Sequence, residues 1–343
     1  MKIGIIGAGI AGLTAGIELK AAGHKVVFYE KSRGYGGRMA TRYGENDKNL
    51  KLDHGVPYIS VKSPEFRKFI DSLLQKKILQ KSTDHIIKWE SKGDQKIIDS
   101  GTDIFTAPDG MNSVGKFLGK YLVIRFEERV TGLDRSSDDT GENKTWEVKC
   151  DSGLTETVDA LIITAPAHQT AELLRSNDDD PYIRQIIEKL GKVVYEPKFA
   201  LMLTYKAVEP PEWGMMKVND DIINFISYES KKRDLRNESF VVHSSPEFAS
   251  KHIDSRDHVV NEMMERLALI LGKWVAKPEW MQLHFWRYSQ AKTSLNDEFL
   301  EVKGNGPPLA LVGSYMKGNT VESAYLSGLR LAGHWITQLS EKK

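Results

Sequence analysis

The sequence predicts an α/β fold built on a parallel sheet, because strand, turn and helix signals alternate at both ends of the chain. Residues 2–6 form a short apolar run, a glycine-rich turn follows at 7–12, and a helical pattern continues from it. Residues 25–29 form a second buried strand and complete a βαβ unit. Near the C-terminus, the apolar run 309–312 precedes a loop and a helix predicted over 321–339. Such alternation is typical of an open sheet with helices on its faces.

The middle of the chain adds further strands and helices, which predict a mixed sheet carrying helices as a second domain. A long polar, glycine-rich connection covers residues 31–60, and connections of this length inside compact domains usually carry function. Apolar positions at helical spacing predict helices at 64–77, 111–118 and 256–271. Predicted strands lie around residues 85–106, 121–134, 145–150, 158–165, 192–196, 199–205, 222–228, 239–244 and 280–288, with a polar hairpin tip at 135–144.

Length and composition limit the classes of protein. At about 150 residues per domain, 343 residues predict two domains. The 48 Lys and Arg against 47 Asp and Glu leave a net charge of +1, so no global field holds nucleic acid or an anionic membrane, and any anion must be bound locally. Cys150 is the only cysteine, which excludes an intramolecular disulfide and predicts a small core residue. The apolar stretch 3–19 is too short and glycine-rich for a membrane span, so we expect a soluble, cytoplasmic protein.

The glycine spacing after the first strand predicts a bound dinucleotide. Gly7 allows a tight turn, Gly9 lets the backbone approach a pyrophosphate, and Gly12 lets the helix pack closely on the strand. The helix N-terminus attracts the phosphate charge. Glu30 ends the next strand, where its carboxylate accepts hydrogen bonds from both hydroxyls of an adenosine ribose. An acid at this position disfavours a 2′-phosphate, so the choice is between NAD and FAD.

The segment after Glu30 favours FAD. A nicotinamide dehydrogenase has no need of the arginine- and glycine-rich run at 33–42. The paired Gly36 and Gly37 let the backbone pass beside a diphosphate or a flavin. Arginines on either side neutralise phosphate charge through forked hydrogen bonds. The local excess of positive charge marks where a diphosphate is expected.

These motifs resemble those of the renalase-like flavoproteins, within the FAD-containing amine-oxidase superfamily. The resemblance runs along nearly the whole chain, and the segments near 194, 241 and 284 point most narrowly to the renalase-like group. The segments are GAGIAG at 7–12, KSRGYGGRMATR at 31–42, LDHGVPYIS at 52–60, DGMNSVGKFL at 109–118, ALIITAPAHQ at 160–169, VYEPKFALML at 194–203, VVHSSPEFAS at 241–250, HFWRYSQA at 284–291 and GSYMKGNTVESAYLSGLRLA at 313–332.

The resemblance implies a discontinuous Rossmann-like FAD-binding domain with an inserted substrate domain that has a mixed sheet and helices. The FAD-binding domain is expected to comprise residues 1–63, 105–168 and 303–343, and the substrate domain residues 64–104 and 169–302. By the same resemblance, Arg38 contacts the diphosphate, Val130 lies at the adenine, and Thr320 and Val321 direct backbone N–H groups at the flavin. The expected cofactor-binding residues are Gly7, Gly9, Ala11, Gly12, Glu30, Lys31, Arg33, Gly36, Gly37, Arg38, Val130, Ser314, Thr320 and Val321.

Two details qualify the expected cofactor site. Where the superfamily commonly has Gly-Asp before the last helix, this chain has Gly313-Ser314, so the usual carboxylate is replaced by a shorter, neutral hydroxyl. No cysteine lies near the last helix, where related amine oxidases can attach flavin covalently. We therefore expect FAD to be bound non-covalently, with affinity and redox tuning that depend on Ser314.

The substrate pocket has candidate residues but no certain catalytic one. His243 ends an apolar strand, where it is either a satisfied structural histidine or a substrate-facing one. Trp286 and Tyr288 share one face of a strand while Arg287 points to the other, so the pair either walls a flat aromatic substrate or fills a core. The nine histidines show no metal-ligand spacing, and no metal is expected.

The resemblance implies an FAD oxidase that returns 2- or 6-dihydro isomers of NAD(P)H to NAD(P)⁺ by hydride transfer to flavin N5, with O2 reduced to H2O2. Such a transfer needs no protein base, and the sequence offers none. The partners are a small-molecule substrate and O2, not nucleic acid or membrane. An amine oxidase or a desaturase on the same scaffold is the alternative, with Lys292 as the candidate lysine for amine oxidation. A flavin-binding protein without turnover is the third hypothesis, motivated by Ser314.

Overall fold

The computed structural model of the chain has two compact units. It describes residues 1–45, 47, 49–82, 86–90, 95–98, 103–137, 144–206, 208–209, 211–233 and 235–341, so the tip 138–143 of the predicted hairpin lies outside the described residues. The first unit comprises residues 1–37, 115–194 and 291–343, and the second comprises residues 38–114 and 195–290. Residues 38–63 and 105–114, expected in the FAD-binding domain, belong to the second unit, while 169–194 and 291–302 belong to the first. The functional domain limits inferred from sequence stay a prediction.

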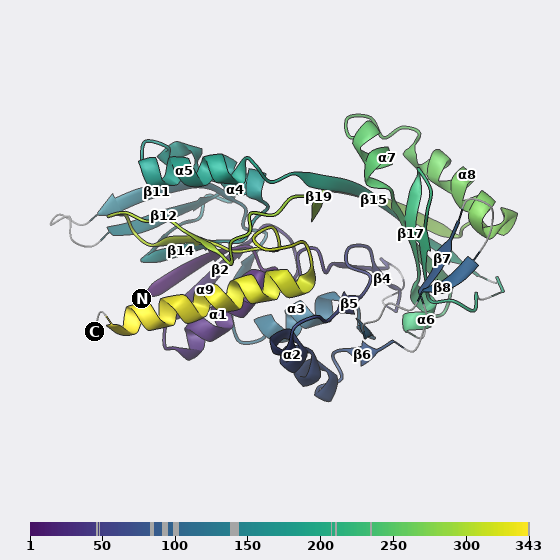
Figure 1. The fold of residues 1–343 in the computed structure, drawn as a ribbon, viewed down its shortest axis with the longest axis horizontal. Helices are drawn as coiled ribbons and strands as arrows, with labels where there is room; N and C mark the ends of the chain where they lie inside the picture. Colours follow the sequence, from purple (N-terminus) through teal and green to yellow (C-terminus); the bar gives the residue numbers. More distant parts are fainter. Residues whose placement is uncertain are drawn as a thin grey trace. The chain divides into compact units, whose positions relative to one another are not determined.

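The first unit is built on a six-stranded sheet of order β10-β2-β1-β14-β21-β20, of which β2 and β14 are labelled in Figure 1. All its neighbours are parallel except β20 and β21. The predicted βαβ unit is confirmed, and β1 lies between β2 and β14, which belong to chain segments far apart in sequence. Ligands of open parallel sheets bind at the carboxyl end of such a central strand. The strands are β1 (Lys2–Ile6), β2 (Lys25–Glu30), β10 (Val123–Phe126), β14 (Ala160–Ile163), β20 (Leu300–Glu301) and β21 (Leu309–Leu311).

Two helices of the first unit, α1 (Ile10–Ala21) and α9 (Val321–Glu341), lie side by side (Figure 1). Their backbones approach so closely that a Cβ on Gly328 would lie 2.1 Å from the carbonyl oxygen of Ala11. A three-stranded antiparallel sheet buries Cys150, as predicted. The other elements are β11 (Val130–Ser137), β12 (Lys144–Cys150), β13 (Thr155–Val158), α4 (Ala167–Leu174), η1 (Arg175–Asn177) and α5 (Pro181–Leu190).

The second unit contains a seven-stranded mixed sheet of order β19-β15-β18-β17-β16-β7-β8. A mixed sheet with helices was predicted for this part of the chain. Its strands are β7 (Ile86–Trp89), β8 (Gln95–Ile98), β15 (Tyr195–Tyr205), β16 (Met215–Val218), β17 (Ile223–Tyr228), β18 (Glu238–Ser244) and β19 (Trp280–Ala291). Smaller elements are β3 (Thr41–Tyr43), β4 (Lys51–Asp53), β5 (Ile59–Ser60), α2 (Pro64–Gln75), β6 (Gln80–Lys81), β9 (Ile104–Thr106), α6 (Glu229–Lys232) and η2 (Lys273–Ala276), and α3 (Asn112–Gly119) contains the limit between the units.

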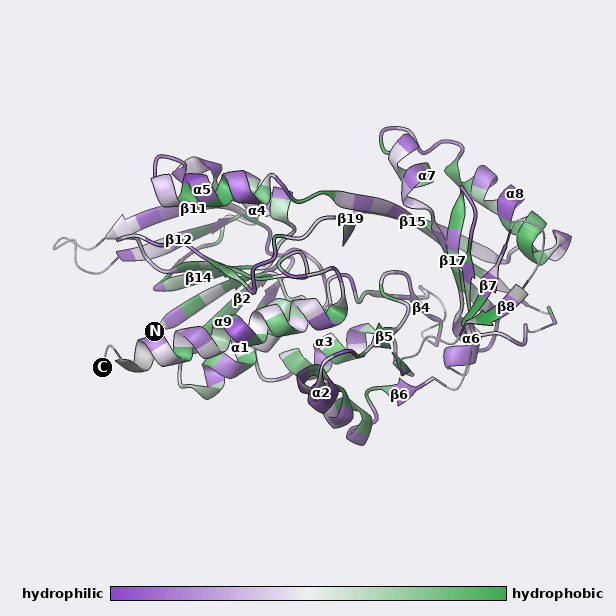
Figure 2. Ribbon diagram, in the orientation of Figure 1, coloured by the Kyte–Doolittle hydropathy of each residue, from purple (hydrophilic) through white to green (hydrophobic). Residues whose placement is uncertain are grey.

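The two faces of this sheet have different coverings. One face packs against α7 (Pro246–Lys251) and α8 (Val259–Leu271) through residues such as Leu201 and Val242. Its strands, such as β17, are largely hydrophobic in Figure 2. On the other face, Ala200 and Val241 pack against Leu52 of β4. This second face carries the polar residues described below.

Two predicted strand limits were wrong. The strand expected over 121–134 is divided into β10 and β11, because Glu127 adopts a positive φ of 59°. The strands expected at 192–196 and 199–205 are one strand, β15. Pro197 precedes the ladder to β18, which begins at Ala200, so its missing N–H breaks no pairing with that strand.

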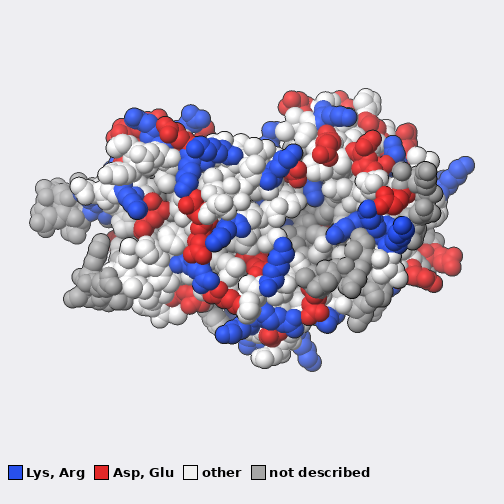
Figure 3. All heavy atoms as spheres, in the orientation of Figure 1, with Lys and Arg blue, Asp and Glu red and all other residues white. Residues whose placement is uncertain are grey.

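Surface charge matches the neutral composition. Basic and acidic side chains are interspersed on the face shown in Figure 3. Among the described residues, no helix is long and apolar enough to cross a membrane.

Candidate functional site

The glycine turn after β1 is sterically required. Gly7 has a φ of +100°, and a Cβ there would lie 2.4 Å from the hydroxyl oxygen of Thr164, which follows β14. A Cβ on Gly12 would lie 2.6 Å from the carbonyl oxygen of Gly7. Both positions therefore need glycine to bring α1 close to the carboxyl ends of β1 and β14.

Gly9 has a different environment, because within the described residues nothing lies within 4 Å of the position its Cβ would take. Gly9 is also the N-cap of α1, with no side-chain cap and no acidic residue in the first turn. The nearest second segment is Gly37, where a Cβ would lie 3.5 Å from the Gly9 Cα, and the N–H of Gly36 donates to the carbonyl of Ala8 at 3.1 Å. The structure thus brings the two glycine segments together around an open helix N-terminus, which fits a diphosphate.

Glu30 is buried, with 6% of its surface exposed, and its carboxylate stabilises the glycine turn through hydrogen bonds. One oxygen accepts the N–H of Ala8 at 2.7 Å, and the other accepts the N–H of Ser32 at 2.8 Å. Each carboxylate oxygen has a second lone pair, so both can still accept a ribose hydroxyl. The backbone carbonyl of Glu30 accepts the N–H of Glu128 at 3.0 Å, which places Val130 two residues from this bond, at the start of β11.

The basic residues of the following loop differ in exposure. Lys31 and Arg33 are exposed, and Arg33 forms an ion pair of 2.9 Å with Glu127. Arg38 belongs to the second unit, where its guanidinium donates to the carbonyl of Ser289 at 3.3 Å. A diphosphate contact for these three side chains stays a prediction.

The N-terminus of α9 is closed by a reciprocal cap. The N–H of Thr320 donates to the hydroxyl of Ser323 at 2.8 Å, and the N–H of Ser323 donates to the hydroxyl of Thr320 at 3.1 Å. The Thr320 amide assigned to the flavin therefore already has a partner, whereas Val321 begins the helix itself. Ser314 is buried, with 3% of its surface exposed.

Two of the predicted substrate-pocket residues meet at one carbonyl group in the second unit. The backbone oxygen of His54 accepts the indole N–H of Trp286 at 2.9 Å and the Nε2–H of His243 at 3.2 Å. His243 is 5% exposed and lies face to face with Phe225, their ring centroids 6.1 Å apart. Tyr288 instead lies edge-on to Tyr195, with ring centroids 5.2 Å apart.

Three rings form what we call the ring cluster: His54, His284 and Trp286. The His54 ring is nearly parallel to the Trp286 indole at 19°, with centroids 5.3 Å apart, and the His284 ring lies 4.6 Å from His54 and 4.5 Å from Trp286. On the opposite face of β19, Arg287 lies over Phe285, which confirms the predicted alternation. Neither histidine of the cluster was predicted from the sequence to be a site residue. His284 precedes Trp286 by two residues on one strand face, and this spacing was the available signal.

The histidines of this region are neutral near pH 7. Burial lowers the pKa of His54 to about 3, with smaller contributions from His284 and from the positive charge of Arg42. Burial likewise lowers the pKa of His243 to about 3 and, together with Arg42, that of His284 to about 4. These rings therefore act as neutral aromatic and hydrogen-bonding groups.

A lysine on the same sheet face was also missed. Ala200 pairs with His243, and Lys198 lies two residues earlier on β15, so all three side chains share one face. Lys198 is partly buried, and this burial lowers its pKa. Lys292, the lysine named from sequence, is exposed.

A buried network of four charges fixes the residue before His54. Asp53 and Glu229 are fully buried, and Glu229 forms an ion pair of 2.6 Å with Lys232. Arg233 pairs with Asp53 and lies 3.5 Å from Glu229. The carboxylate of Glu229 also accepts the N–H of Asp53 at 3.0 Å. Because two acids face two bases, the cluster is neutral and holds the end of β4 in place.

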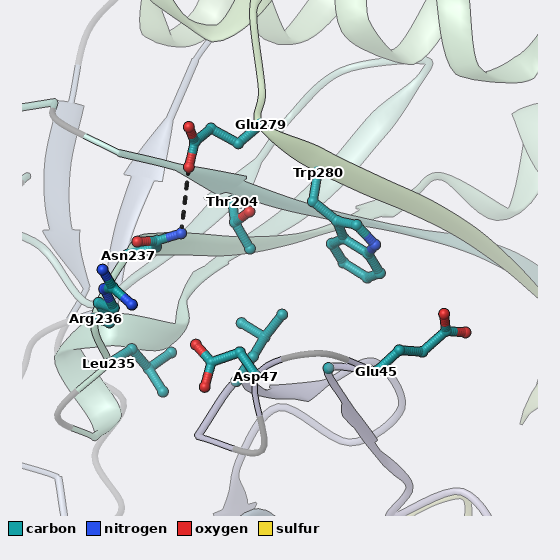
Figure 4. Close-up of a pocket in the computed structure, with 10 residues that line it drawn as sticks. Glu45, Asp47, Thr204, Leu235, Arg236, Asn237, Glu279 and Trp280 are labelled. Carbon is teal, nitrogen blue, oxygen red and sulfur yellow. Dashed lines mark hydrogen bonds between the residues drawn. The ribbon is translucent and has the colours of Figure 1, made fainter.

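A cavity of about 430 Å³ opens at another part of the second unit (Figure 4). Trp280 projects toward it from the start of β19, and Asn237 donates to Glu279 at 3.4 Å on its border. Within the described ranges, no three His, Cys, Asp or Glu side chains come together as a metal site. The lining residues are Gly44, Glu45, Asp47, Leu50, Thr204, Leu235, Arg236, Asn237, Glu279 and Trp280.

Comparison with known proteins places this geometry in a class. The sequence profile described as "Flavin containing amine oxidoreductase" matches residues 87–334, well over half of the chain, and that of an NAD(P)-binding Rossmann-like domain matches residues 5–73. The chain belongs to the family of flavin-containing amine oxidoreductases, and it is an FAD-dependent oxidoreductase.

Particular relatives refine this assignment. The chain is similar to mouse (Mus musculus) renalase, with 29% identity over 313 residues, which cover 86% of this chain and 87% of renalase. Its fold is similar to that of a candidate protoporphyrinogen oxidase from Exiguobacterium sp. 255-15 (13% identity, TM-score 0.77) and of putrescine oxidase bound to putrescine (15% identity, TM-score 0.72). Both fold comparisons cover 98% of this chain and 99% of the other. The predicted fold class, an FAD-binding Rossmann-like domain with a substrate domain, is confirmed.

Proposed function

We propose that the protein is an oxidase that converts 2- or 6-dihydro isomers of NAD(P)H to NAD(P)⁺. The substrate loses a hydride, and O2 gains this hydride and one proton from solvent to give H2O2. When bound, FAD supplies the two-electron chemistry by accepting the hydride at N5. The similarity to renalase across most of both chains supports this reaction.

We propose that FAD is held non-covalently by the first unit. The open N-terminus of α1 at Gly9 accommodates the diphosphate, and Glu30 accepts hydrogen bonds from the adenosine ribose. The fit rests on the unfilled space at Gly9 and on the spare lone pairs of Glu30. The other sequence-assigned residues, among them Val130, Ser314 and Val321, are proposed to complete the site.

The ring cluster is the observation that carries the choice of substrate class. A dihydropyridine is flat and releases a hydride without a base, so it requires a neutral aromatic surface rather than a proton acceptor. His54, His284 and Trp286 provide such a surface, because both histidines are neutral, the His54 ring stacks with the indole and the His284 ring lies edge-on to it. We propose that His243 positions the cluster through the His54 carbonyl instead of contacting the substrate.

The test is anaerobic mixing of the FAD-loaded protein with 2-, 4- and 6-dihydronicotinamide dinucleotides. We expect rapid loss of the oxidised flavin absorbance with the 2- and 6-isomers, and its return with formation of H2O2 when O2 is admitted. A flavin that stays oxidised with both isomers would refute the proposal. Steady O2 consumption would exclude a flavin-binding protein without turnover.

Amine oxidation is the second candidate, and one observation favours it. Lys198 is partly buried with a lowered pKa on the same sheet face as His243, which suits the lysine that amine oxidation usually requires better than the exposed Lys292 does. A panel of amines in the same anaerobic assay tests it. Flavin reduction by an amine that is lost in Lys198→Met, with dihydropyridine oxidation absent, would establish this candidate instead.

A further inference from the structure

Arg42 is a cation for which the described part of the chain supplies no counter-ion. It is partly buried, and no carboxylate of the described residues lies within 4.0 Å of its guanidinium. Its Nε atom is buried and has no hydrogen-bond partner. A buried donor without a partner destabilises the folded protein, so a ligand that supplies the acceptor would recover that free energy.

The strand pairing places Arg42 on the side of the ring cluster. Arg42 pairs with Leu52 across β3 and β4, so their side chains share a face, and Leu52 belongs to the buried cluster against which Trp286 packs. The neighbouring Thr41 points the other way, where its hydroxyl donates to Asp53 at 2.8 Å. The positive charge of Arg42 is felt by both histidines of the cluster.

A second unsatisfied atom belongs to the ring cluster itself. The Nδ1 atom of His54 is buried without a hydrogen-bond partner, and the residue is only 5% exposed. The backbone there is closely fitted, since a Cβ on Gly55 would lie 1.9 Å from the carbonyl oxygen of Arg38 and 3.4 Å from the Trp286 ring. The His54 ring is therefore fixed in position while its Nδ1 has no partner.

We propose that Arg42 and His54 of the ring cluster form a subsite for an anionic oxygen group, namely a phosphate of the substrate. A guanidinium and an imidazole N–H are both donors to phosphate oxygens, and the pairing supplies the missing counter-charge. The choice of phosphate rests on the proposed function, since dihydronicotinamide dinucleotides carry a diphosphate. The subsite itself rests on the unpaired cation and the two unpartnered atoms.

Direct binding tests the subsite without catalysis. Inorganic phosphate and pyrophosphate are titrated calorimetrically into FAD-loaded wild type, Arg42→Gln and Arg256→Gln. Arg256 is the matched control, because it also influences His284 but lies over Phe285, on the opposite face of β19, at 4.5 Å. We expect at least tenfold weaker binding in Arg42→Gln and less than twofold change in Arg256→Gln. Equal affinity of the Arg42 variant and the wild type overturns the proposal.

Kinetics separate the subsite from the proposed reaction and from the cofactor. With phosphate-bearing dihydro isomers, Arg42→Gln should raise KM about tenfold with little change in kcat, while the corresponding nucleoside without phosphate should be oxidised equally by both proteins. Loss of FAD from Arg42→Gln, with unchanged discrimination between the two substrates, would assign Arg42 to the cofactor and refute the subsite. If no dihydro isomer is oxidised but the calorimetric difference holds, the proposed function fails and the subsite stands. Arg42→Lys retains the positive charge but lacks the forked pair of guanidinium N–H donors, so it should bind pyrophosphate with intermediate affinity.

Discussion

The glycine turn of the first unit and the ring cluster of the second are assembled in opposite ways. The turn joins consecutive elements, and residues 7–12 are followed directly by the helix they open. The ring cluster takes its members from the end of β4 and from β19, more than 200 residues apart, with His243 of β18 behind them. The turn needs glycine because of close backbone approach, whereas the cluster needs a buried framework that fixes each ring. Local geometry therefore determines the first region, and long-range contacts determine the second.

The largest expected effect concerns the framework of the ring cluster. Glu229→Ala removes one of the two acids of a buried network, so the two positive charges of Lys232 and Arg233 face only one negative charge. Breaking a buried pair typically costs about 3–5 kcal/mol of unfolding free energy. Chemical denaturation of the variant measures this loss.

The matched control is Glu172→Ala, in an exposed ion pair of 2.8 Å with Arg175. We expect a change below about 0.5 kcal/mol there. If both variants lose equally little stability, the buried network is not what holds the second region together.

The next effect is a pH dependence that belongs to the second region. Burial lowers the pKa of His243 from 6.5 to about 3, so below pH 6.5 the unfolded chain binds a proton that the folded chain does not. Stability should therefore fall as pH decreases from about 6.5 toward 3, by about 1.4 kcal/mol per pH unit for one such histidine.

Thermal unfolding between pH 7 and 4.5 measures this slope in the wild type and in His243→Gln. In His243→Gln the stability should fall less steeply with decreasing pH than in the wild type, because the contribution of His243 is absent, whatever the variant's stability at pH 7. An unchanged slope would mean that His243 is protonated in the folded protein.

Gly9→Ala tests whether the open N-terminus of α1 in the first unit holds the diphosphate. Because the space at Gly9 is open, the apoprotein should lose less than about 1 kcal/mol, the range for replacing an N-cap glycine. If a diphosphate fills that space, the methyl group should raise the Kd for FAD at least tenfold, measured by fluorescence titration. The control is Gly333→Ala, in α9 and also open, which should bind FAD normally and gain about 0.5–1 kcal/mol of stability. Normal FAD binding by Gly9→Ala would place the diphosphate elsewhere.

The smallest expected effect is that of Arg33→Ala. Its ion pair with Glu127 is exposed, with 89% of the Arg33 side chain accessible, and such pairs contribute about 0–1 kcal/mol. Stability should not change measurably, and FAD titration then decides whether Arg33 serves the cofactor. An unchanged Kd would remove Arg33 from the expected diphosphate contacts.

Much of the fold could be predicted because its signals are local. The βαβ unit, the helix at α2 beginning with Pro64 and the alternation in β19 follow from periodicity and turn residues, and the structure contains them. The strand break at Glu127 was not predicted, because a positive φ is unusual for a glutamate. The continuation of β15 through Pro197 was not predicted either, because it depends on where the pairing with β18 begins. His54, His284 and Lys198 were missed because no spacing along the chain reveals which distant residues share a sheet face.

The α/β class, the glycine turn and the choice of FAD follow from the amino-acid sequence alone, since each depends on the conformational requirements of residues that are neighbours in the chain. The packing of distant segments is what stacks His54 on Trp286, sets His284 edge-on to it, keeps both histidines neutral, and leaves Arg42 without an ion pair among the described residues. The physical reason is that desolvation and pairing depend on which groups surround an atom in space. Those surroundings arise only when β4, β15, β18 and β19 are packed together.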